Sequence, residues 1–206
     1  MYTPAHFAEA DPEIIAEVVA RHPLATLVAQ TGAGLVANHI PLLRAGDDLV
    51  GHVALANDLH RDLPDGSPVL AIFGAGAAYV SPNWYPSKAA THRAVPTWNY
   101  RVVHIHGPLH WSHADRDKRR AVHLLTAAME GRTHGAQGWR MGDAPADYMA
   151  GMLANIVAFR IRIDRVLAKS KLSQNRDAAD RQGVIDALAD GRAPELAAMM
   201  RKPAPP

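Results

Sequence analysis

The spacing of hydrophobic and polar positions indicates a first helix followed by several short strands. Asp11 and Pro12 precede an apolar face that includes Ile14 and Val18, which is the pattern of a capped amphipathic helix. Between residues 24 and 54, short apolar runs are separated by glycine-containing turns, as in antiparallel strands joined by hairpins. The continuous apolar run 69–73 predicts a strand buried on both faces, and Gly74 with Gly76 is then expected to loosen the chain.

Residues 98–111 alternate strictly between apolar and polar positions, which predicts a long half-buried strand. Its polar face carries His104, His106 and His110. Two histidines at i and i+2 could share a metal ion, but no third ligand stands at a recognisable spacing, so histidines on a polar strand face are favoured. Axial ligation of haem by one of them stays open. Residues 157–163 repeat the same alternation.

Helical periodicity returns at 112–129, at 145–153 and in the C-terminal part of the chain. There, residues 177–201 are expected to form a helical hairpin that covers a barrel. The same segment has the layout of a helix-turn-helix, yet its second helix carries few basic side chains with which to contact DNA. The hairpin is therefore the favoured interpretation.

The composition excludes several classes of protein but does not identify a single one. The 206 residues are 48% hydrophobic and 20% charged, which suits one globular unit. A formal net charge of +2 is too small to indicate nucleic-acid binding. The lack of cysteine excludes disulfides and thiolate chemistry. Neither a signal peptide nor an apolar segment of membrane-spanning length is evident, so a cytoplasmic protein without a membrane partner is expected.

Residues 78–100 concentrate five aromatic side chains and three prolines in a chain that is only 6% aromatic. The prolines exclude a regular helix, and rings interleaved with hydroxyl groups and a lysine suit a planar ligand that carries a phosphate. A proline-bent loop whose rings plug the edge of a barrel fits equally well. The candidate ligand contacts in this stretch are Ser81, Trp84, Tyr85, Lys88, Thr97, Trp98 and Asn99.

Two further polar clusters interrupt apolar strands. Asn38, His39 and Pro41 stand inside the second predicted strand, where they face either a ligand or an exposed edge, and His52 and Asn57 share this ambiguity. The sequence KSKLSQN follows a predicted strand at residues 169–175. Its two lysines and two hydroxyl groups can receive a phosphate, although a solvated strand end has the same composition.

Three motifs occur together in one order: YVSPNWY at 79–85, VPTWNY at 95–100 and KLSQN at 171–175. With MYTPAHF at 1–7 and GHVALAN at 51–57, they span nearly the whole chain. In these motifs the chain resembles the PaiB family, which comprises flavin-binding negative transcriptional regulators built on the FMN-binding split barrel.

The resemblance implies a mainly β fold with flanking helices, a six-stranded antiparallel FMN-binding split barrel. It implies a single domain over residues 1–206, with the barrel at about 24–172 around inserted helices. The chain would be a homodimer that holds FMN in a groove to which both subunits contribute. It would regulate transcription by contacting DNA or a regulatory partner protein. A flavin-dependent oxidoreductase, or a haem-binding or haem-degrading protein on the same barrel, is the alternative, and no catalytic residue is assigned.

The resemblance to split-barrel flavoproteins also implies roles for individual residues. The flavin ring and ribityl chain would contact the second and third strands, and Asn57 would lie near the phosphate. The 78–100 stretch would close the site, and Lys88 and the KLSQN turn would contact the phosphate or the ring edge. The full set of expected cofactor-binding residues is Asn38, His39, Ile40, Pro41, Leu42, His52, Val53, Asn57, Ser81, Trp84, Tyr85, Lys88, Thr97, Trp98, Asn99, Lys171, Ser173 and Gln174.

Overall fold

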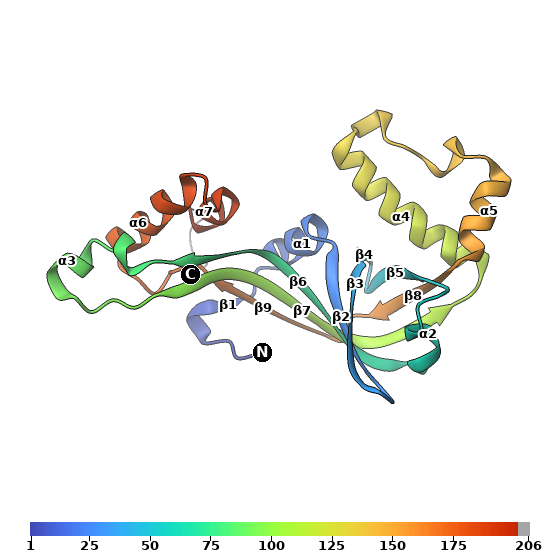
Figure 1. Cartoon of the computed structure of the whole chain (residues 1–206), viewed down its shortest axis with the longest axis horizontal. Coiled ribbons are helices and arrows are strands. Elements are labelled where there is room, and N and C mark those ends of the chain that lie inside the picture. Colours follow the sequence, from blue (N-terminus) through green and yellow to red (C-terminus); the bar gives the residue numbers. More distant parts are fainter. Residues whose placement is uncertain (202–206) are drawn as a thin grey trace. The chain divides into compact units, whose positions relative to one another are not determined.

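The computed structural model describes residues 1–201 and consists of antiparallel strands flanked by helices (Figure 1). The strands are β1 Ala8–Glu9, β2 Leu24–Thr31, β3 Gly34–Pro41, β4 Leu43–Ala45, β5 Asp48–Ala54, β6 Ser67–Val80, β7 Thr97–Ser112, β8 Ile156–Arg162 and β9 Arg165–Lys171. The helices are α1 Pro12–Arg21, α2 Leu59–Asp62, α3 Ser87–Thr91, α4 Asp115–Thr133, α5 Ala146–Ala154, α6 Ala178–Ala189 and α7 Pro194–Arg201.

The strands pair in the order β3-β2-β6-β7-β8-β5-β4, and β9 pairs with both β1 and β7. The prediction of a mainly antiparallel β fold with flanking helices is confirmed. The expected number of six strands was wrong, because the described residues form nine strands in a sheet that is not closed. The additional β1 and β4 contain only two and three residues, too few for a period-2 pattern to be recognised.

The chain divides into two compact units, and three strands contribute to both. Unit 1 comprises residues 1–18, 74–103 and the described residues from Leu167 onward, and unit 2 comprises residues 19–73 and 104–166. Strands β6 and β7 and the start of β9 therefore pass from one unit into the other. Gly74 and Gly76 lie within β6 and do not end it, contrary to the expectation that they loosen the chain.

Unit 2 encloses a core between β2, β3, β5 and β8. Leu42, Leu49 and Ile161 are fully buried there. A Cβ atom at Gly51 would lie 2.6 Å from Leu42 Cδ2 and 2.9 Å from Phe159 Cζ, so glycine allows the close packing at this point. On the other face of β5, helix α4 packs through Ala121 against β5 and β8.

Unit 1 is built around the end of β6 and the helices α6 and α7, which lie beside it in Figure 1. Val80 and Tyr85 pack with apolar side chains of both helices, including Leu196. A Cβ atom at Gly183 on α6 would lie 2.1 Å from the carbonyl oxygen of Trp84, so only glycine permits this approach. Among the helices of residues 1–201, none is both long and apolar enough to cross a membrane.

Candidate functional site

The predicted contacts on β3 divide between the two faces of the strand. Strands β2 and β3 pair in a continuous register, so residues directly opposite one another share a face. His39 lies opposite Thr26, and its Nδ1 is 3.1 Å from the Thr26 hydroxyl oxygen. Leu35 on the same face is 75% exposed. We call this surface the β2–β3 face; it comprises Leu24, Thr26, Val28, Gln30, Leu35, Ala37, His39 and Pro41.

Asn38 and Ile40 point to the opposite face of β3, where the structure brings Asn38 and Asn57 together. The Asn57 side-chain amide donates to Asn38 Oδ1 at 2.9 Å, and Asn57 Oδ1 accepts from the backbone N–H of Leu59 at 3.0 Å. This pair therefore ties β3 to the start of α2. Ile40 is buried, as is Leu42, which follows the strand.

His52 and Val53 also point to opposite sides, because neighbouring residues of β5 alternate along its unbroken pairing with β8. Val53 is buried in the core. His52 instead faces the side covered by α4 and α5, where it lines a cavity with residues of both helices. Burial lowers the pKa of the His52 imidazole below its ordinary value, so the ring is neutral at pH 7.

The histidines of β7 interact with protein groups within unit 2. His106 Nδ1 accepts from the Arg165 guanidinium at 3.2 Å, and His110 Nδ1 lies 3.0 Å from Asp65 Oδ2. Burial, and secondarily the charge of Arg165, lowers the pKa of His106. The hydrogen bond from His110 lowers the pKa of Asp65. Among the described residues, no cluster of three or more His, Asp or Glu side chains is arranged to hold a metal ion.

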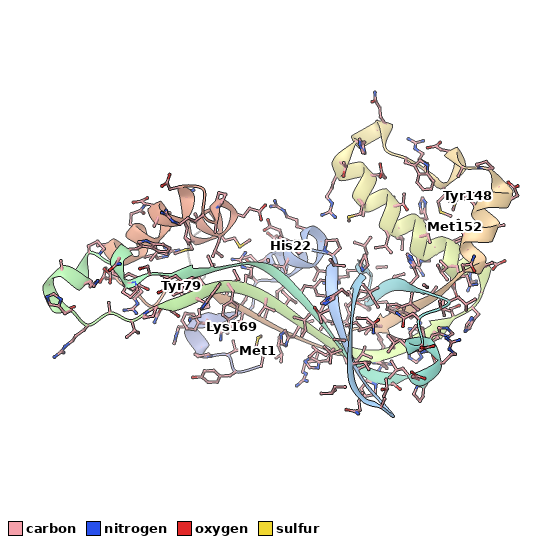
Figure 2. All side chains as sticks on the ribbon, viewed as in Figure 1. Met1, His22, Tyr79, Tyr148, Met152 and Lys169 are labelled. Carbon is pink, nitrogen blue, oxygen red and sulfur yellow. The ribbon has the colours of Figure 1, made fainter. Side chains whose placement is uncertain are left out.

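In unit 1, Trp98 presents an aromatic surface to solvent. Its side chain is 56% exposed, and the Tyr79 ring packs edge-on against it with the centroids 6.1 Å apart. Tyr79 projects from β6 (Figure 2). The T-shaped contact orients the indole, and the exposed part of the indole offers the aromatic surface that stacking against a planar ligand requires.

Trp84 and Tyr85 belong instead to the packing of unit 1. Tyr85 is buried against α6 and α7, and Trp84 packs on the same cluster. The Arg192 guanidinium lies 5.9 Å from the Trp84 ring centroid. Burial raises the pKa of the Tyr85 phenol. Ser81 accepts from the backbone N–H of Asn83 at 3.2 Å and so caps the short 3₁₀ turn Pro82–Trp84.

The KLSQN turn lies against the start of β7. Asn99 is 0% exposed and its amide donates to the Ser173 hydroxyl at 2.9 Å, while that hydroxyl donates back to Asn99 Oδ1 at 3.2 Å. Gln174 accepts from the backbone N–H of Leu172 at 2.7 Å and donates to the carbonyl of Ser170. These three polar side chains therefore hold the turn, in which Ser173 adopts a φ of 59°.

Lys171 is the cation of this turn, and its ammonium donates to the Thr97 hydroxyl. Within residues 1–201, no carboxylate forms an ion pair with Lys171. The remaining donors of the ammonium are thus free to bind an anion. Lys88, the other lysine of the expected site, donates to Asn83 Oδ1 on the neighbouring 3₁₀ turn.

Sequence reasoning missed a buried polar network in unit 1. Arg101 Nε donates to the Ser170 hydroxyl at 2.8 Å, and that hydroxyl donates to Glu9 Oε2 at 2.7 Å. All three residues are buried, and burial lowers the pKa of Arg101 while Glu9 opposes the shift. The one available signal was the register of β7, which places Arg101 on the inward face together with Val103.

Lys169 and Asp180 are two further buried charges that were not expected. The Lys169 ammonium lies 5.4 Å from the ring centroid of Tyr100 and donates to the carbonyl of Tyr2 at 3.2 Å (Figure 2). Asp180 accepts from both the backbone N–H and the hydroxyl of Ser87, at 3.0 and 2.7 Å. These contacts attach the N-terminal segment to β9 and the start of α3 to α6.

Comparison with solved structures identifies the fold. The FAD and haem binding protein from Mycobacterium smegmatis aligns with a TM-score of 0.60 and 22% identity, over 85% of this chain and 78% of that one. The flavocytochrome Anf3 from Azotobacter vinelandii aligns with a TM-score of 0.57 and 14% identity, over 80% of this chain and 69% of that one. At these identities the likeness shows the fold alone, which is that of the split-barrel flavoproteins.

Comparison of sequences then gives the family. The sequence model described as "Putative FMN-binding domain" matches residues 1–165. Over 203 residues the chain is 29% identical to "Protease synthase and sporulation protein PAI 2" of Bacillus subtilis (strain 168), covering 97% of this chain and 94% of that protein. The chain belongs to this family of FMN-binding proteins, the PaiB family, and FMN is its cofactor.

The side chains present are suited to FMN, which combines a planar tricyclic ring, a polyhydroxylated chain and a phosphate. Lys171 offers an ammonium free of carboxylates beside the Thr97 hydroxyl, as a phosphate requires. Trp98 offers an open aromatic face. The KLSQN turn follows the end of the family match at residue 165, so its part in binding is argued from these contacts.

Proposed function

We propose that this chain is an FMN-binding transcriptional regulator that holds its flavin at a homodimer interface. The observation that carries the proposal is the ammonium of Lys171, which is oriented by Thr97 and lacks a carboxylate partner among the described residues, in a chain of an FMN-binding family. The Bacillus subtilis relative is named as a protease synthase and sporulation protein, so its name connects it with sporulation.

Phosphate binding is assigned to Lys171 and Thr97, with Lys88 as a second cation. The isoalloxazine ring stacks on Trp98, whose orientation Tyr79 fixes. Within unit 2, the Asn38–Asn57 pair holds β3 and the start of α2 in place, and His39 contributes a polar group to the β2–β3 face. The remaining expected residues act by positioning these contacts. The turn that carries Lys171 is held by Asn99, Ser173 and Gln174. The adjoining aromatic stretch is held by Ser81, Trp84 and Tyr85. The strands around the polar groups are shaped by Ile40, Pro41, Leu42 and Val53.

Dimerisation is assigned to the β2–β3 face. This face exposes apolar side chains, with Leu35 at 75%, on a regular sheet surface of unit 2. An exposed apolar sheet face of this kind is a common site of self-association. Because a twofold interface uses the same patch of both subunits, each apolar residue of the face is buried twice in the dimer.

Replacement of one leucine tests this assignment. Burying a leucine contributes about 1.5–3 kcal/mol, so Leu35→Glu, which acts twice, weakens the dimer at least about 100-fold. Sedimentation velocity over a concentration series measures the dissociation constant. The control is Leu55→Glu, which changes a partly exposed leucine of unit 2 outside the face and leaves the dimer intact. An unchanged dissociation constant in Leu35→Glu would place the interface elsewhere.

Regulation is tested with DNA from upstream of the protein's own gene. Fluorescence anisotropy with and without FMN, over a range of salt concentrations, separates specific recognition from charge-driven binding, which weakens steeply with salt. We expect specific binding whose affinity changes when flavin is added. Equal affinity for unrelated DNA at every salt concentration would contradict direct regulation.

The alternative of a flavin-dependent oxidoreductase uses the same site, because FMN supplies the hydride and electron chemistry and the protein need only bind and orient it. Steady-state oxidation of NAD(P)H by the flavin-loaded protein would favour this alternative. A Soret band in the freshly purified protein would favour the haem-binding or haem-degrading alternative. We expect neither result in a protein that responds to flavin by changing its DNA affinity.

A further inference from the structure

Helices α4 and α5 and the loop between them line the cavity at His52 in unit 2, which has a volume of about 300 Å³. His52 on β5 and Ile156 on β8 line it on the sheet side, and Val122 lines it from α4. Trp139, Tyr148 and Met152 line it from the loop and α5. This volume is at the lower end of the range for small-molecule sites in proteins.

The walls of the cavity carry no charge. Its lining residues include no Lys, Arg, Asp or Glu, so neither a phosphate nor a carboxylate would find a partner there. Two aromatic rings and methionine side chains make up much of the surface instead, and both groups pack well against a flat ring. The lining therefore selects a neutral aromatic molecule and disfavours a second FMN.

The rim of the cavity is more exposed than a structural core would be. Trp139 is 41% exposed, Tyr148 58% and Met152 50%, and the last two project from α5 (Figure 2). Three neighbouring apolar side chains that remain half exposed indicate an interaction site, since isolated exposed residues are common but clusters are not.

The loop that carries Trp139 is held in place by hydrogen bonds. The Glu130 carboxylate on α4 accepts from the backbone N–H of Trp139 at 3.1 Å and lies 2.9 Å from His134 Nδ1. A Cβ atom at Gly138 would lie 2.8 Å from the Glu130 Cβ, so the loop fits closely on the helix. The cavity is thus built into unit 2, which lowers the entropic cost of filling it.

His52 is the polar group in this apolar lining that lacks a partner. Its Nδ1 is buried beyond the reach of a ligand, whereas Nε2 is not among the buried atoms, and no group of the described residues bonds either nitrogen of the ring. Nε2 is therefore the nitrogen with which a ligand in the cavity can form a hydrogen bond. A hydroxyl group both donates and accepts, so it serves a neutral imidazole in either tautomer.

From these observations we propose that the α4–α5 cavity is a binding site for a neutral aromatic alcohol, a phenol or naphthol, whose ring packs against Trp139 and Tyr148 while its hydroxyl bonds His52. The site is separate from the phosphate and ring contacts assigned to FMN. It does not depend on the proposed regulatory function, because each of its walls belongs to unit 2.

A matched pair of ligands tests the site in the full-length, FMN-loaded protein. The probes are 2-naphthol and 2-methylnaphthalene, which differ by a hydroxyl and a methyl group of similar size. Without a hydrogen bond the more apolar 2-methylnaphthalene binds more tightly, since the methyl group gains more on leaving water. With the bond to His52 we expect calorimetry to show saturable binding of 2-naphthol that is about tenfold tighter.

Variants locate the binding. His52→Leu keeps the apolar volume and removes the hydrogen-bonding group, so the preference for 2-naphthol reverses. Tyr148→Ala, at an exposed position that packing does not require, weakens both probes about tenfold or more. Tyr2→Ala, another exposed tyrosine but in unit 1, leaves both affinities unchanged.

Any one of the following results in these titrations would overturn the proposal: no saturable binding of 2-naphthol up to its solubility limit, equal or tighter binding of 2-methylnaphthalene, persistence of the 2-naphthol preference in His52→Leu, or unchanged affinities in Tyr148→Ala. Flavin fluorescence is recorded in the same titration. Release of FMN in proportion to bound naphthol would show that both ligands share one site, which also overturns the proposal.

Discussion

Replacing Lys171 by alanine separates recognition of the phosphate from recognition of the flavin ring. Lys171 is half-buried, its ammonium donates to Thr97, and no carboxylate of the described chain neutralises it. A hydrogen bond to a charged group contributes about 1.5–3 kcal/mol. Loss of one such bond to the phosphate weakens FMN binding by about 10-fold to 150-fold.

Riboflavin carries the same ring and ribityl chain without the phosphate. Because it has no phosphate for Lys171 to bind, Lys171→Ala should change the affinity for riboflavin by less than about threefold. Quenching of flavin fluorescence in parallel titrations measures both dissociation constants. Lys171→Arg keeps the positive charge and should recover most of the FMN affinity, whereas Thr97→Val should lose a smaller part of it, because only the orienting hydroxyl is removed. Equal losses for the two flavins, or no loss for either, would refute the assignment of Lys171 to the phosphate. Thermal denaturation of each variant confirms that the fold is intact.

Three further predictions follow from the packing of the candidate residues. Trp98→Ala removes an exposed stacking surface, so flavin affinity falls about tenfold with little change in melting temperature, whereas Trp84→Ala loses core packing and costs about 3 kcal/mol of unfolding free energy in urea titrations. A larger stability loss in Trp98→Ala than in Trp84→Ala would reverse the two roles. Asp180→Ala leaves the Ser87 donors unpaired and costs about 3 kcal/mol, measured in the same way, while a surface Asp190→Ala control costs almost nothing. Burial holds the pKa of His52 below its ordinary 6.5, so the imidazole is protonated less readily in the folded chain than in the unfolded chain. The contribution of the neutral ring to the free energy of unfolding is therefore complete above pH 6.5 and declines as the pH falls below that value. The decline between pH 7 and pH 5 should be shallower in His52→Leu, and an identical slope in the two proteins would contradict the burial of the ring.

The class of fold could be predicted because alternation along a strand is a local property. The strict alternation of residues 98–111 and 157–163 indicated β7 and β8, and the hairpin spacing between residues 24 and 54 indicated β2, β3 and β5. The prediction that Gly74 and Gly76 loosen the chain was wrong, because both residues lie within β6. Glycine weakens a strand locally, but pairing with neighbouring strands on either side of the glycines can keep the strand continuous.

Residue types identified polar clusters, but not whether each side chain faces a ligand or the interior. Asn99 and Trp98 are neighbours in one motif, yet the alternation of β7 buries the first and exposes the second. The partners of buried charges were also beyond prediction. Glu9 and Ser170 are 161 residues apart in the sequence and meet only through the pairing of β1 with β9.

The passage of β6, β7 and β9 through both units has a practical consequence for anyone who wishes to dissect the molecule. The chain crosses the boundary after residues 18, 73, 103 and 166, so each unit is assembled from separate stretches of polypeptide. No single truncation can release either half as a continuous, self-sufficient fragment. Deleting the C-terminal helices would remove the partners of Tyr85 and leave the aromatic stretch without its packing. Dissection must therefore proceed by point substitution, and a protease that nicks one strand should unravel both halves together.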